Sequence, residues 1–401
     1  MSEPPSLPLA NVRVIELGQL LAGPFCGQLL ADFGTEVIKV EDPAGGDPMR
    51  QWGREKPHGK SLWWPVVARN KKSVTINLRT DRGQEVVRDL IATSDVLVEN
   101  FRPGTLERWN LSPDDLWRVN PGLIIARVSG YGQTGPYAQR AGYGSIGEAM
   151  GGIRYLTGDP ASPPARTGIS LGDSLAAVFA CIGTLVALHA RKTTGRGQIV
   201  DAAIYESVLA LMESLLPEWE LAGYKRERTG SVLPNVAPSN VYPAKGGQSI
   251  LIAANQDTVF RRLAEVMGEP QLAEDDRFRT HDARGRNMDE LDELIARWSS
   301  RERADHLIEL LNNAGVPAGS IYSAEEMLDD IHFNTREAIV RLQHPKFGEF
   351  PMQNVFPKLS DTPGRIRHAG PSLGEHNGEI LHGMLGLDLD EIRDLQVSSA
   401  P

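Results

Sequence analysis

The chain has 401 residues, 41% of them hydrophobic, and a formal net charge of −10. This length allows two or three domain-sized units, and the apolar content excludes a disordered chain. The negative charge argues against broad binding to nucleic acid or to an anionic membrane.

The first two hundred residues alternate between short apolar runs and helix-like segments. Strands are expected at 12–17, 36–40, 73–78, 95–99 and 123–128, and helices at 24–33 and 81–93. Alternation of this kind predicts an α/β fold in which helices cover a parallel sheet.

The rest of the chain is more varied. A core helix is expected from the turn at 170–174 to about His189, and another over 202–216, where Pro217 would kink or end it. Residues 223–247 are rich in Gly, Pro, Asn and Ser, which is typical of a long loop or a domain crossing. From Ile339 prolines interrupt the chain. The other elements expected are a strand at 249–253 and helices at 257–267, 288–299, 303–313, 379–385 and 390–395.

Several features indicate the compartment. Cys26 and Cys181 lie in apolar helical contexts, as expected of buried thiols in a reducing compartment. The first residues lack the basic region and apolar core of a signal peptide. The apolar run from Leu175 to Ala190 is short for a bilayer span. We therefore expect a cytoplasmic protein that does not bind membranes.

Eight basic residues gather in a short part of this acidic chain. Such a group forms either a solvated face or a site for an anionic ligand. The residues are Arg50, Arg54, Lys56, Lys60, Arg69, Lys71, Lys72 and Arg79.

Standard cofactor motifs are not evident. Gly18, Gly23 and Gly27 lie near the first strand–helix turn, but their spacing matches neither G-x-G-x-x-G nor a P-loop. None of the nine histidines has a metal-ligand spacing, and there is no C-x-x-C. We expect no metal site.

The segment Gly172-Asp173-Ser174-Leu175 spells the signature of the GDSL esterases, with Ser174 as nucleophile. Asp329 and His332 supply a D-x-x-H pair for it. That chemistry also needs oxyanion donors, and the Gly and Asn blocks that provide them are not apparent. The esterase interpretation is therefore disfavoured.

Asp173 has two interpretations. Asp and Ser favour helix N-termini because they accept hydrogen bonds from unpaired backbone N–H groups, so capping is the ordinary role. The same location favours the ionised carboxylate, which can attack an activated carbonyl. The adjacent Gly172 would allow a thioester to approach the backbone closely. Local sequence leaves a capping residue and a nucleophile both open.

As a whole, the chain from Val12 to about Leu385 resembles the class III coenzyme A transferases, which include formyl-CoA:oxalate and carnitine CoA-transferases. Each shared motif is weak alone, but their number and order make the resemblance specific. They are LAGP at 21–24, EVIKVE at 36–41, RNKKS at 69–73, VENFRPG at 98–104, SGYG at 129–132, GD at 172–173, TGRGQ at 194–198, DRF at 276–278 and LGEH at 373–376.

The resemblance implies a catalytic role for Asp173, which matches the family's nucleophilic aspartate. Attack on an acyl-CoA would give an aspartyl anhydride, and the CoA thiolate would convert it to an aspartyl–CoA thioester that delivers CoA to an acceptor acid. CoA is then a substrate, and no tightly bound cofactor is needed. The residues that match the family's CoA contacts are Ala22, Ile76, Arg79, Asn100, Phe101, Arg102, Arg108 and Tyr143.

The chain departs from the family pattern at three places. Asp42 replaces an arginine, Leu21 replaces a CoA-contacting glutamine, and TGSVLP at 229–234 replaces a glycine-rich loop. These differences argue against formyl-CoA and oxalate as substrates; succinyl-CoA and a dicarboxylate are the expected pair. An α-methylacyl-CoA racemase is the alternative, but its catalytic histidine would fall near Tyr143, so the transferase is favoured.

The resemblance also implies an architecture. A large Rossmann-like CoA-binding domain would comprise residues 1–222 and 330–401, and a smaller α+β domain with its linkers would comprise 223–329. Two such chains would interlock as a homodimer. The expected partners are acyl-CoA and carboxylic acid substrates, without nucleic acid.

Overall fold

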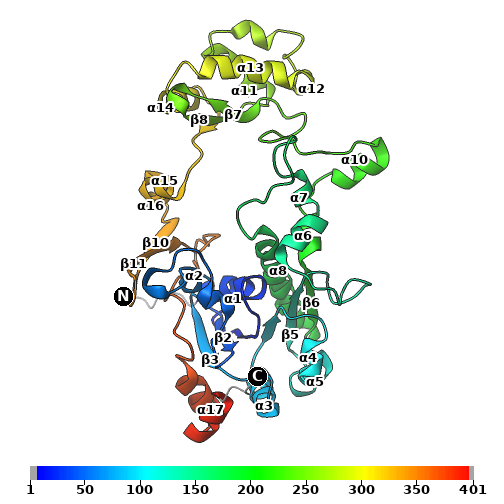
Figure 1. Cartoon of the computed structure of the whole chain (residues 1–401), viewed down its shortest axis with the longest axis vertical. Coiled ribbons are helices and arrows are strands. Elements are labelled where there is room, and N and C mark those ends of the chain that lie inside the picture. The colour runs from blue at the N-terminus through cyan, green and yellow to red at the C-terminus, as the bar shows by residue number, and fades with distance from the viewer. Residues whose placement is uncertain (1–6, 397–401) are drawn as a thin grey trace. The chain divides into compact units, whose positions relative to one another are not determined.

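The computed structural model describes residues 7–396. The chain divides into two compact units, which are described separately (Figure 1). The first comprises Met1–Arg154, Thr167–Pro217 and Thr335–Pro401, and the second comprises Tyr155–Arg166 and Glu218–Asn334.

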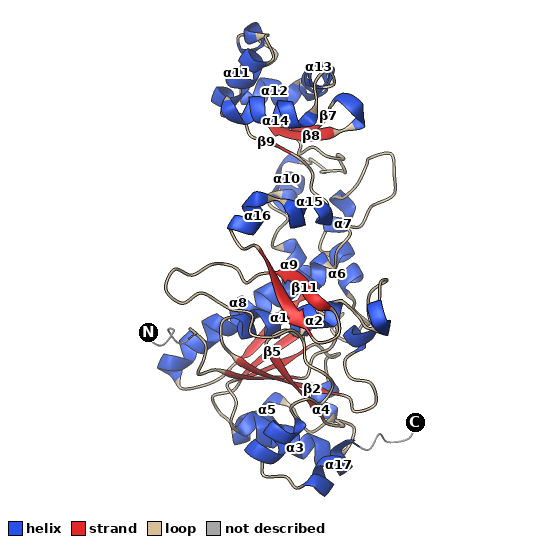
Figure 2. Ribbon diagram, turned by 90° about the vertical axis from the view of Figure 1, so that its left-hand side faces the viewer, coloured by secondary structure: helices blue, strands red, loops and turns tan. Residues whose placement is uncertain are grey.

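A six-stranded sheet, with every strand parallel to its neighbours, organises the first unit (Figure 2). The strand order is β3-β2-β1-β4-β5-β6. This confirms the expected parallel α/β sheet. The strands are β1 (Arg13–Glu16), β2 (Glu36–Glu41), β3 (Lys71–Thr75), β4 (Val96–Glu99), β5 (Ile124–Ser129) and β6 (Ile199–Ala203).

Helices cover both faces of this sheet because successive side chains of a strand point to opposite faces. Val14 of β1 packs in the apolar cluster with α1 (Ala22–Asp32) and α8 (Leu171–Thr194). Its neighbour Ile15 packs in the opposite cluster, with α3 (Asp81–Ala92) and α5 (Pro113–Val119). Both strand residues are fully buried, so the unit has three layers around two apolar interfaces.

The C-terminal segment returns to the same unit. It contains the antiparallel pair β10 (Ile339–His344) and β11 (Gly348–Gln353), the π-helix Gly378–Met384 and α17 (Leu389–Gln396). The side chain of Asn377 accepts a hydrogen bond from the N–H of Thr75 and donates one to its hydroxyl. The segment is thereby fixed to the edge strand β3. The other helices of the unit are α2 (Trp63–Val67), α4 (Thr105–Arg108), α6 (Gly144–Met150), α7 (Ile153–Leu156), α9 (Ile204–Leu209) and α10 (Leu215–Ala222), of which α7 and α10 continue into the second unit.

The second unit has its own core. A three-stranded antiparallel sheet of order β7-β8-β9 packs with helices around Tyr242, Phe260 and Phe278, all essentially buried. The strands are β7 (Ser239–Pro243), β8 (Ser249–Ala253) and β9 (Ala318–Gly319). The helices are α11 (Asp257–Val266), α12 (His281–Arg286), α13 (Met288–Ser299), α14 (Ala304–Asn313), α15 (Ala324–Asp329) and α16 (Ile331–Thr335).

The expected helix over 202–216 is wrong. Strand β6 occupies Ile199–Ala203, α9 ends at Leu209, and a separate helix, α10, begins at Leu215. Pro217 lies in the first turn of α10, where a missing N–H is tolerated, rather than ending a helix.

Three smaller expectations also differ from the structure. Strand β3 begins two residues earlier than predicted and ends at Thr75. The loop expected over 223–247 contains β7, and the proline-interrupted segment after Ile339 contains a β-hairpin. Pro351 is accommodated because that hairpin forms its own two-stranded sheet, so each strand has a free edge.

Helix α8 is the longest apolar element. Within residues 7–396 it is the one helix long and apolar enough to cross a membrane, a property that core helices share. Its residues Ala176, Ala177 and Ala180 are fully buried against the sheet. Cys26 of α1 and Cys181 of α8 are free, buried thiols, as expected. A hydrogen bond that the Cys26 thiol donates to Cys181, together with burial, raises the pKa of Cys26.

Candidate active site

The residues predicted from the sequence gather at the carboxyl ends of the parallel strands. In open α/β sheets this edge is where ligands bind, because the loops that leave the strands diverge there. Two groups form on it, one in the loops after β1–β4 and one in the segment between β5 and β6.

The first group lines a small pocket. Ile76, Arg79 and Phe101 contribute to a cavity of about 90 Å³ beside Gln19 and Asp42. Ile76 is buried and Arg79 is exposed, and the ring of Phe101 packs edge-on against Trp109, with centroids 5.1 Å apart. The structure therefore brings three of the eight predicted contact residues together around one opening.

Asn100 joins the loops that follow β1 and β4. Its Oδ1 accepts the N–H of Gln19 at 2.7 Å, and its Nδ2 donates to the Gln19 carbonyl at 2.9 Å. The amide lies against two glycines: a Cβ on Gly18 would be 2.8 Å from Asn100 Oδ1, and one on Gly23 would be 3.2 Å from it. These glycines serve close packing, as the sequence indicated, rather than a nucleotide-phosphate motif.

A buried charge network underlies the same turn. Lys39 Nζ contacts Glu16 at 2.9 Å, Asp47 at 2.8 Å and the Gly18 carbonyl at 2.7 Å. Lys71 Nζ contacts Glu16 at 2.8 Å and the Pro24 carbonyl at 2.6 Å. Burial opposes the charge on Lys39, yet Asp47, Glu16 and Glu41 raise its pKa. Burial lowers the pKa of Lys71 despite Glu16. The two ammonium groups fix both ends of the β1–α1 turn.

The other predicted contacts of this region lie around the pocket. Ala22 is the first residue of α1 and is buried. Arg102 and Arg108 are exposed in the segment after β4, and Arg108 Nη2 donates to Thr105 Oγ1 at 2.9 Å. Neither guanidinium forms an ion pair within the described residues 7–396.

The basic residues from Arg69 to Lys72 form ion pairs within the protein, so they are neither of the two alternatives that the sequence left open, a solvated face or an anion site. Arg69 pairs with buried Asp32 at 2.6 Å, and Lys71 belongs to the buried network. Lys72 pairs with Glu36 and Glu379. Arg79, which follows this segment, is exposed at the carboxyl edge.

The second group surrounds the first turn of α8. The N-cap residue of this helix is Ser170, and Asp173 is its third helical residue, so the expectation that Asp173 is the N-cap is wrong in position. The first turn still favours an anionic side chain. The hydroxyl of Ser174 donates to the Ser170 carbonyl at 2.9 Å.

The half-buried Asp173 carboxylate lies against α6. A Cβ on Gly144 would be only 2.1 Å from Asp173 Oδ2. Tyr143, which precedes this glycine, caps α6 and is 54% exposed. Gly142 in turn lies against Gly130 of the loop after β5, where a Cβ on Gly130 would be 2.6 Å from the Gly142 Cα. Close glycine contacts thus bring Tyr143 and Asp173 to one place.

A buried carboxylate that the sequence reasoning missed supports this arrangement. Glu148 of α6 is 1% exposed, and its Oε1 accepts the N–H of Gly172 at 3.3 Å. Its Oε2 accepts from Arg154 at 2.6 Å. Glu148 therefore links α6 directly to the backbone of the first turn of α8. In the sequence, the only indication of a role for Glu148 was its place as an acid within the glycine-rich run 144–152.

The described part of the chain holds no cluster of three or more His, Cys, Asp or Glu side chains suited to a metal ion. The edge instead combines a carboxylate at a helix N-terminus with a pocket that carries an exposed arginine.

Comparison with known proteins shows which enzymes and structures this chain is similar to. The chain is 60% identical to a succinyl-CoA–D-citramalate CoA-transferase of Chloroflexus aurantiacus, over 98% of each chain. It is 42% identical to the beta subunit of a succinyl-CoA–L-malate CoA-transferase of that organism, over 98% of this chain and 97% of the relative. A crystal structure of a CAIB/BAIF family protein from Brucella suis matches with a TM-score of 0.83 and 34% identity, over 94% of this chain and 100% of that one.

The family model described as CoA-transferase family III matches residues 9–377. This match and the full-length relatives confirm the resemblance found in the sequence motifs. The chain belongs to CoA-transferase family III.

Proposed function

We propose that this CoA-transferase moves CoA from succinyl-CoA to a hydroxylated dicarboxylate of the citramalate or malate type, with Asp173 as the nucleophile. The observation that carries the proposal is the Asp173 carboxylate in the first turn of α8, packed on the Cα of Gly144. The two Chloroflexus relatives, whose names specify succinyl-CoA with D-citramalate and with L-malate, support the substrate class.

The chemistry divides one exchange into steps that each need only a carboxylate and a thiolate. An Asp173 oxygen attacks the thioester carbonyl and the C–S bond breaks, which gives a mixed anhydride and the CoA thiolate. The thiolate attacks Asp173 Cγ and releases succinate, leaving an aspartyl–CoA thioester. The acceptor carboxylate attacks the same carbon and expels the thiolate. Finally the thiolate attacks the acceptor carbonyl, which forms the new acyl-CoA and regenerates Asp173.

The chain's own residues have distinct parts in this scheme. The first turn of α8 stabilises Asp173 as an anion, and the Glu148–Gly172 contact holds that turn in place. We assign the CoA contacts to Ala22, Ile76, Arg79, Asn100, Phe101, Arg102, Arg108 and Tyr143. The three arginines suit phosphate groups because a guanidinium offers paired donors. A pocket of about 90 Å³ would take one part of the CoA molecule, and the rest would lie along the edge.

The strand order supports a Rossmann-like classification, since 3-2-1-4-5-6 is the order of the doubly wound nucleotide-binding sheets. In these folds the ligand crevice opens where the strand order reverses. Here that point lies between β1 and β4, whose following residues Gln19 and Asn100 are hydrogen-bonded to each other.

An exposed apolar stripe on α8 supports a homodimer. Phe179, Ile182 and Val186 follow one face of the helix and are 37%, 51% and 62% exposed. Contiguous apolar patches of this kind commonly mark protein interfaces. Light scattering of Ile182→Glu against the wild type tests this: we expect the variant to have half the mass, and equal masses would contradict it. The cytoplasmic location stays a prediction.

The nucleophile is tested by trapping. Protein incubated with succinyl-CoA and then treated with hydroxylamine or borohydride should carry a modification at Asp173 by peptide mass spectrometry. Asp173→Asn should abolish both the modification and CoA exchange between succinyl-CoA and citramalate. Asp81→Asn is the matched control, because Asp81 is also an acid in a first helical turn. No adduct on Asp173, together with exchange retained in Asp173→Asn, would sink the assignment.

A further inference from the structure

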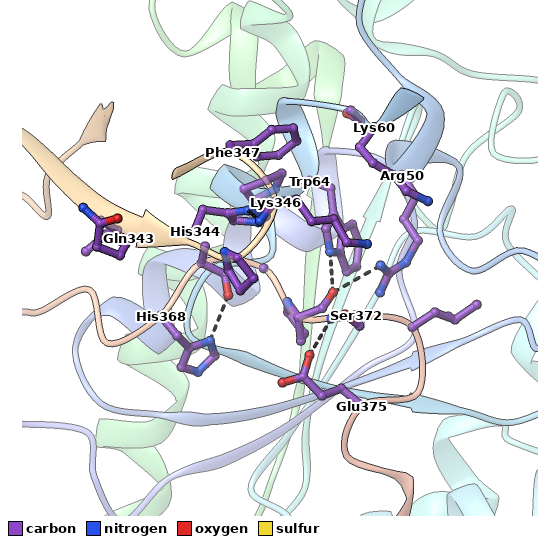
Figure 3. A pocket seen from close by; sticks show the side chains of 18 of the residues that line it. Arg50, Lys60, Trp64, Gln343, His344, Lys346, Phe347, His368, Ser372 and Glu375 are labelled. Carbon is purple, nitrogen blue, oxygen red and sulfur yellow. Dashed lines mark hydrogen bonds between the residues drawn. The ribbon is translucent and has the colours of Figure 1, made fainter. Parts of the chain in front are cut away.

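A second cavity in the first unit lies apart from Asp173 and from the residues assigned to CoA. It has a volume of about 680 Å³ and contains none of those residues in its lining. Three segments distant in sequence form it: the stretch from Gly45 to Pro65, the β10–β11 turn and the stretch from Arg367 to His376 (Figure 3).

The floor of the cavity is held by specific contacts. Trp64 Nε1 and Arg50 Nη1 both donate to the Pro371 carbonyl, at 2.7 and 3.2 Å. The Arg50 guanidinium stacks 3.6 Å above the Trp64 ring and pairs through two nitrogens with buried Glu41, at 2.7 and 2.8 Å. These contacts fix the first and third segments to each other, as expected of a preformed site.

The wall carries an excess of unpaired positive charge. Lys60, Lys346 and Arg367 line the cavity, and none of the three forms an ion pair within residues 7–396. Glu375 is the one carboxylate among the lining residues, and it accepts the N–H of Ser372 at 2.6 Å. Arg367 Nη2 donates to the carbonyls of Ala31 and Asn70, at 3.4 and 3.3 Å, and the three cations outnumber the one acid of the lining. An anionic ligand would balance the positive charges of the lining.

The rest of the lining suits a compact ligand with polar groups. His344 stacks on Phe347 with ring centroids 4.6 Å apart, which stiffens the hairpin turn that carries Lys346. His368 and His376 of the third segment add imidazole rings to the lining. The volume lies within the range of about 300–1,000 Å³ of small-molecule sites.

We propose that this cavity binds a small polyanion, a molecule with two or more carboxylate or phosphate groups, at a site separate from that of the transfer reaction. Lys60, Lys346 and Arg367 line it from three different segments. The proposal goes beyond the transferase function and does not depend on Asp173 as nucleophile.

Calorimetric titration of the full-length protein tests the site with two probes. Citrate represents the polycarboxylates and pyrophosphate represents the phosphates, each titrated up to about 10 mM because weak anion sites fall in the millimolar range. We expect saturable binding of at least one probe, with one site per chain. Binding of citrate alone, or of pyrophosphate alone, identifies the carboxylate or the phosphate source.

A double variant locates the binding. Lys60→Gln/Lys346→Gln should weaken binding by about tenfold or more, as two charge-assisted contacts are lost. The matched control Lys192→Gln/Lys245→Gln removes the same charge from two exposed lysines outside the cavity and should leave the affinity within about twofold. Saturating CoA should not displace the probe. No saturable binding of either probe, equal losses in the two double variants, or displacement by CoA would overturn the proposal.

Discussion

The Asp173 carboxylate lies directly over the Cα of Gly144, where an added Cβ would be 2.1 Å from Oδ2. No side chain fits there unless the carboxylate moves, because real Cβ atoms are essentially never found within 3.0 Å of another heavy atom. A glycine in the first turn of α6 therefore determines where the proposed nucleophile can be.

Gly144→Ala tests that relationship. We expect kcat for CoA transfer to fall by about a hundredfold, since displacing a reacting group by about 1 Å costs that much. The KM for acyl-CoA should change little, because the pocket with Arg79 and Phe101 is untouched. Gly378→Ala is the control, as a Cβ there meets nothing within 4 Å. An unchanged kcat in Gly144→Ala would show that the carboxylate is not constrained by this contact.

Asn100→Ala removes the amide that joins the turns after β1 and β4. Both polar groups of the Gln19 backbone lose their partner, so we expect the KM for acyl-CoA to rise and the free energy of unfolding to fall by about 1–2 kcal/mol. Initial rates over a range of succinyl-CoA concentrations and urea unfolding measure the two effects.

Asn120→Ala is the matched control for this variant. The side chain of Asn120 bonds the carbonyls of Ile91 and Ser94, at the amino ends of the strands rather than the carboxyl ends. It should reduce stability by a similar amount and leave KM unchanged. If the two variants raised KM equally, the effect of Asn100 would be one of stability alone.

The sequence predicted much of the central sheet, because buried parallel strands are short apolar runs. It failed at β6, where Asp201 interrupts the five residues Ile199–Ala203 and the first three are not buried. Such an edge strand has little apolar signal. The β10–β11 hairpin was hidden because β10 has no buried residue and Pro351 interrupts β11 between the buried Phe350 and Met352.

The site was predictable only in part. Asp173 and Asn100 follow from motifs, whereas the contacts of Asp173 with Gly144 and of Gly172 with Glu148 arise from packing between helices α6 and α8. Local patterns do not encode such contacts. The ion pairs of the basic segment could not be predicted because its partners are distant: Lys71 pairs with Glu16, 55 residues away. The sign available in the sequence was Glu16, an acid beside the apolar residues of β1, which suggests a buried ion pair.

Glu16→Gln should destabilise the fold strongly. Glu16 is fully buried and contacts both Lys39 and Lys71, so its loss leaves buried ammonium groups short of a partner. Breaking a buried pair from one side costs about 3–5 kcal/mol, which guanidinium unfolding would measure. The double variant Glu16→Gln/Lys71→Met removes the stranded charge as well and should recover part of the loss, since Lys39 keeps Asp47. A double variant less stable than Glu16→Gln alone would contradict this account.

Glu99 should make stability depend on pH. This last residue of β4 is 1% exposed, and burial raises the pKa of its carboxyl from 4.5 to about 7, although Arg127 lies 2.7 Å away. The folded protein therefore holds a proton that the unfolded chain releases at lower pH, so the contribution of Glu99 to stability is complete below pH 4.5 and is lost as the pH rises through 7.

Glu99→Gln removes this titration. The free energy of unfolding of the variant minus that of the wild type should therefore increase between pH 5 and pH 8, by up to about 3 kcal/mol. Urea unfolding of both proteins at the two pH values measures it, and subtraction cancels the titration of all other groups. A difference that stays constant or shrinks toward pH 8 would mean that the ion pair with Arg127 keeps Glu99 charged throughout. In that case the carboxylate beside Asn100 would act as a fixed charge at the edge of the sheet.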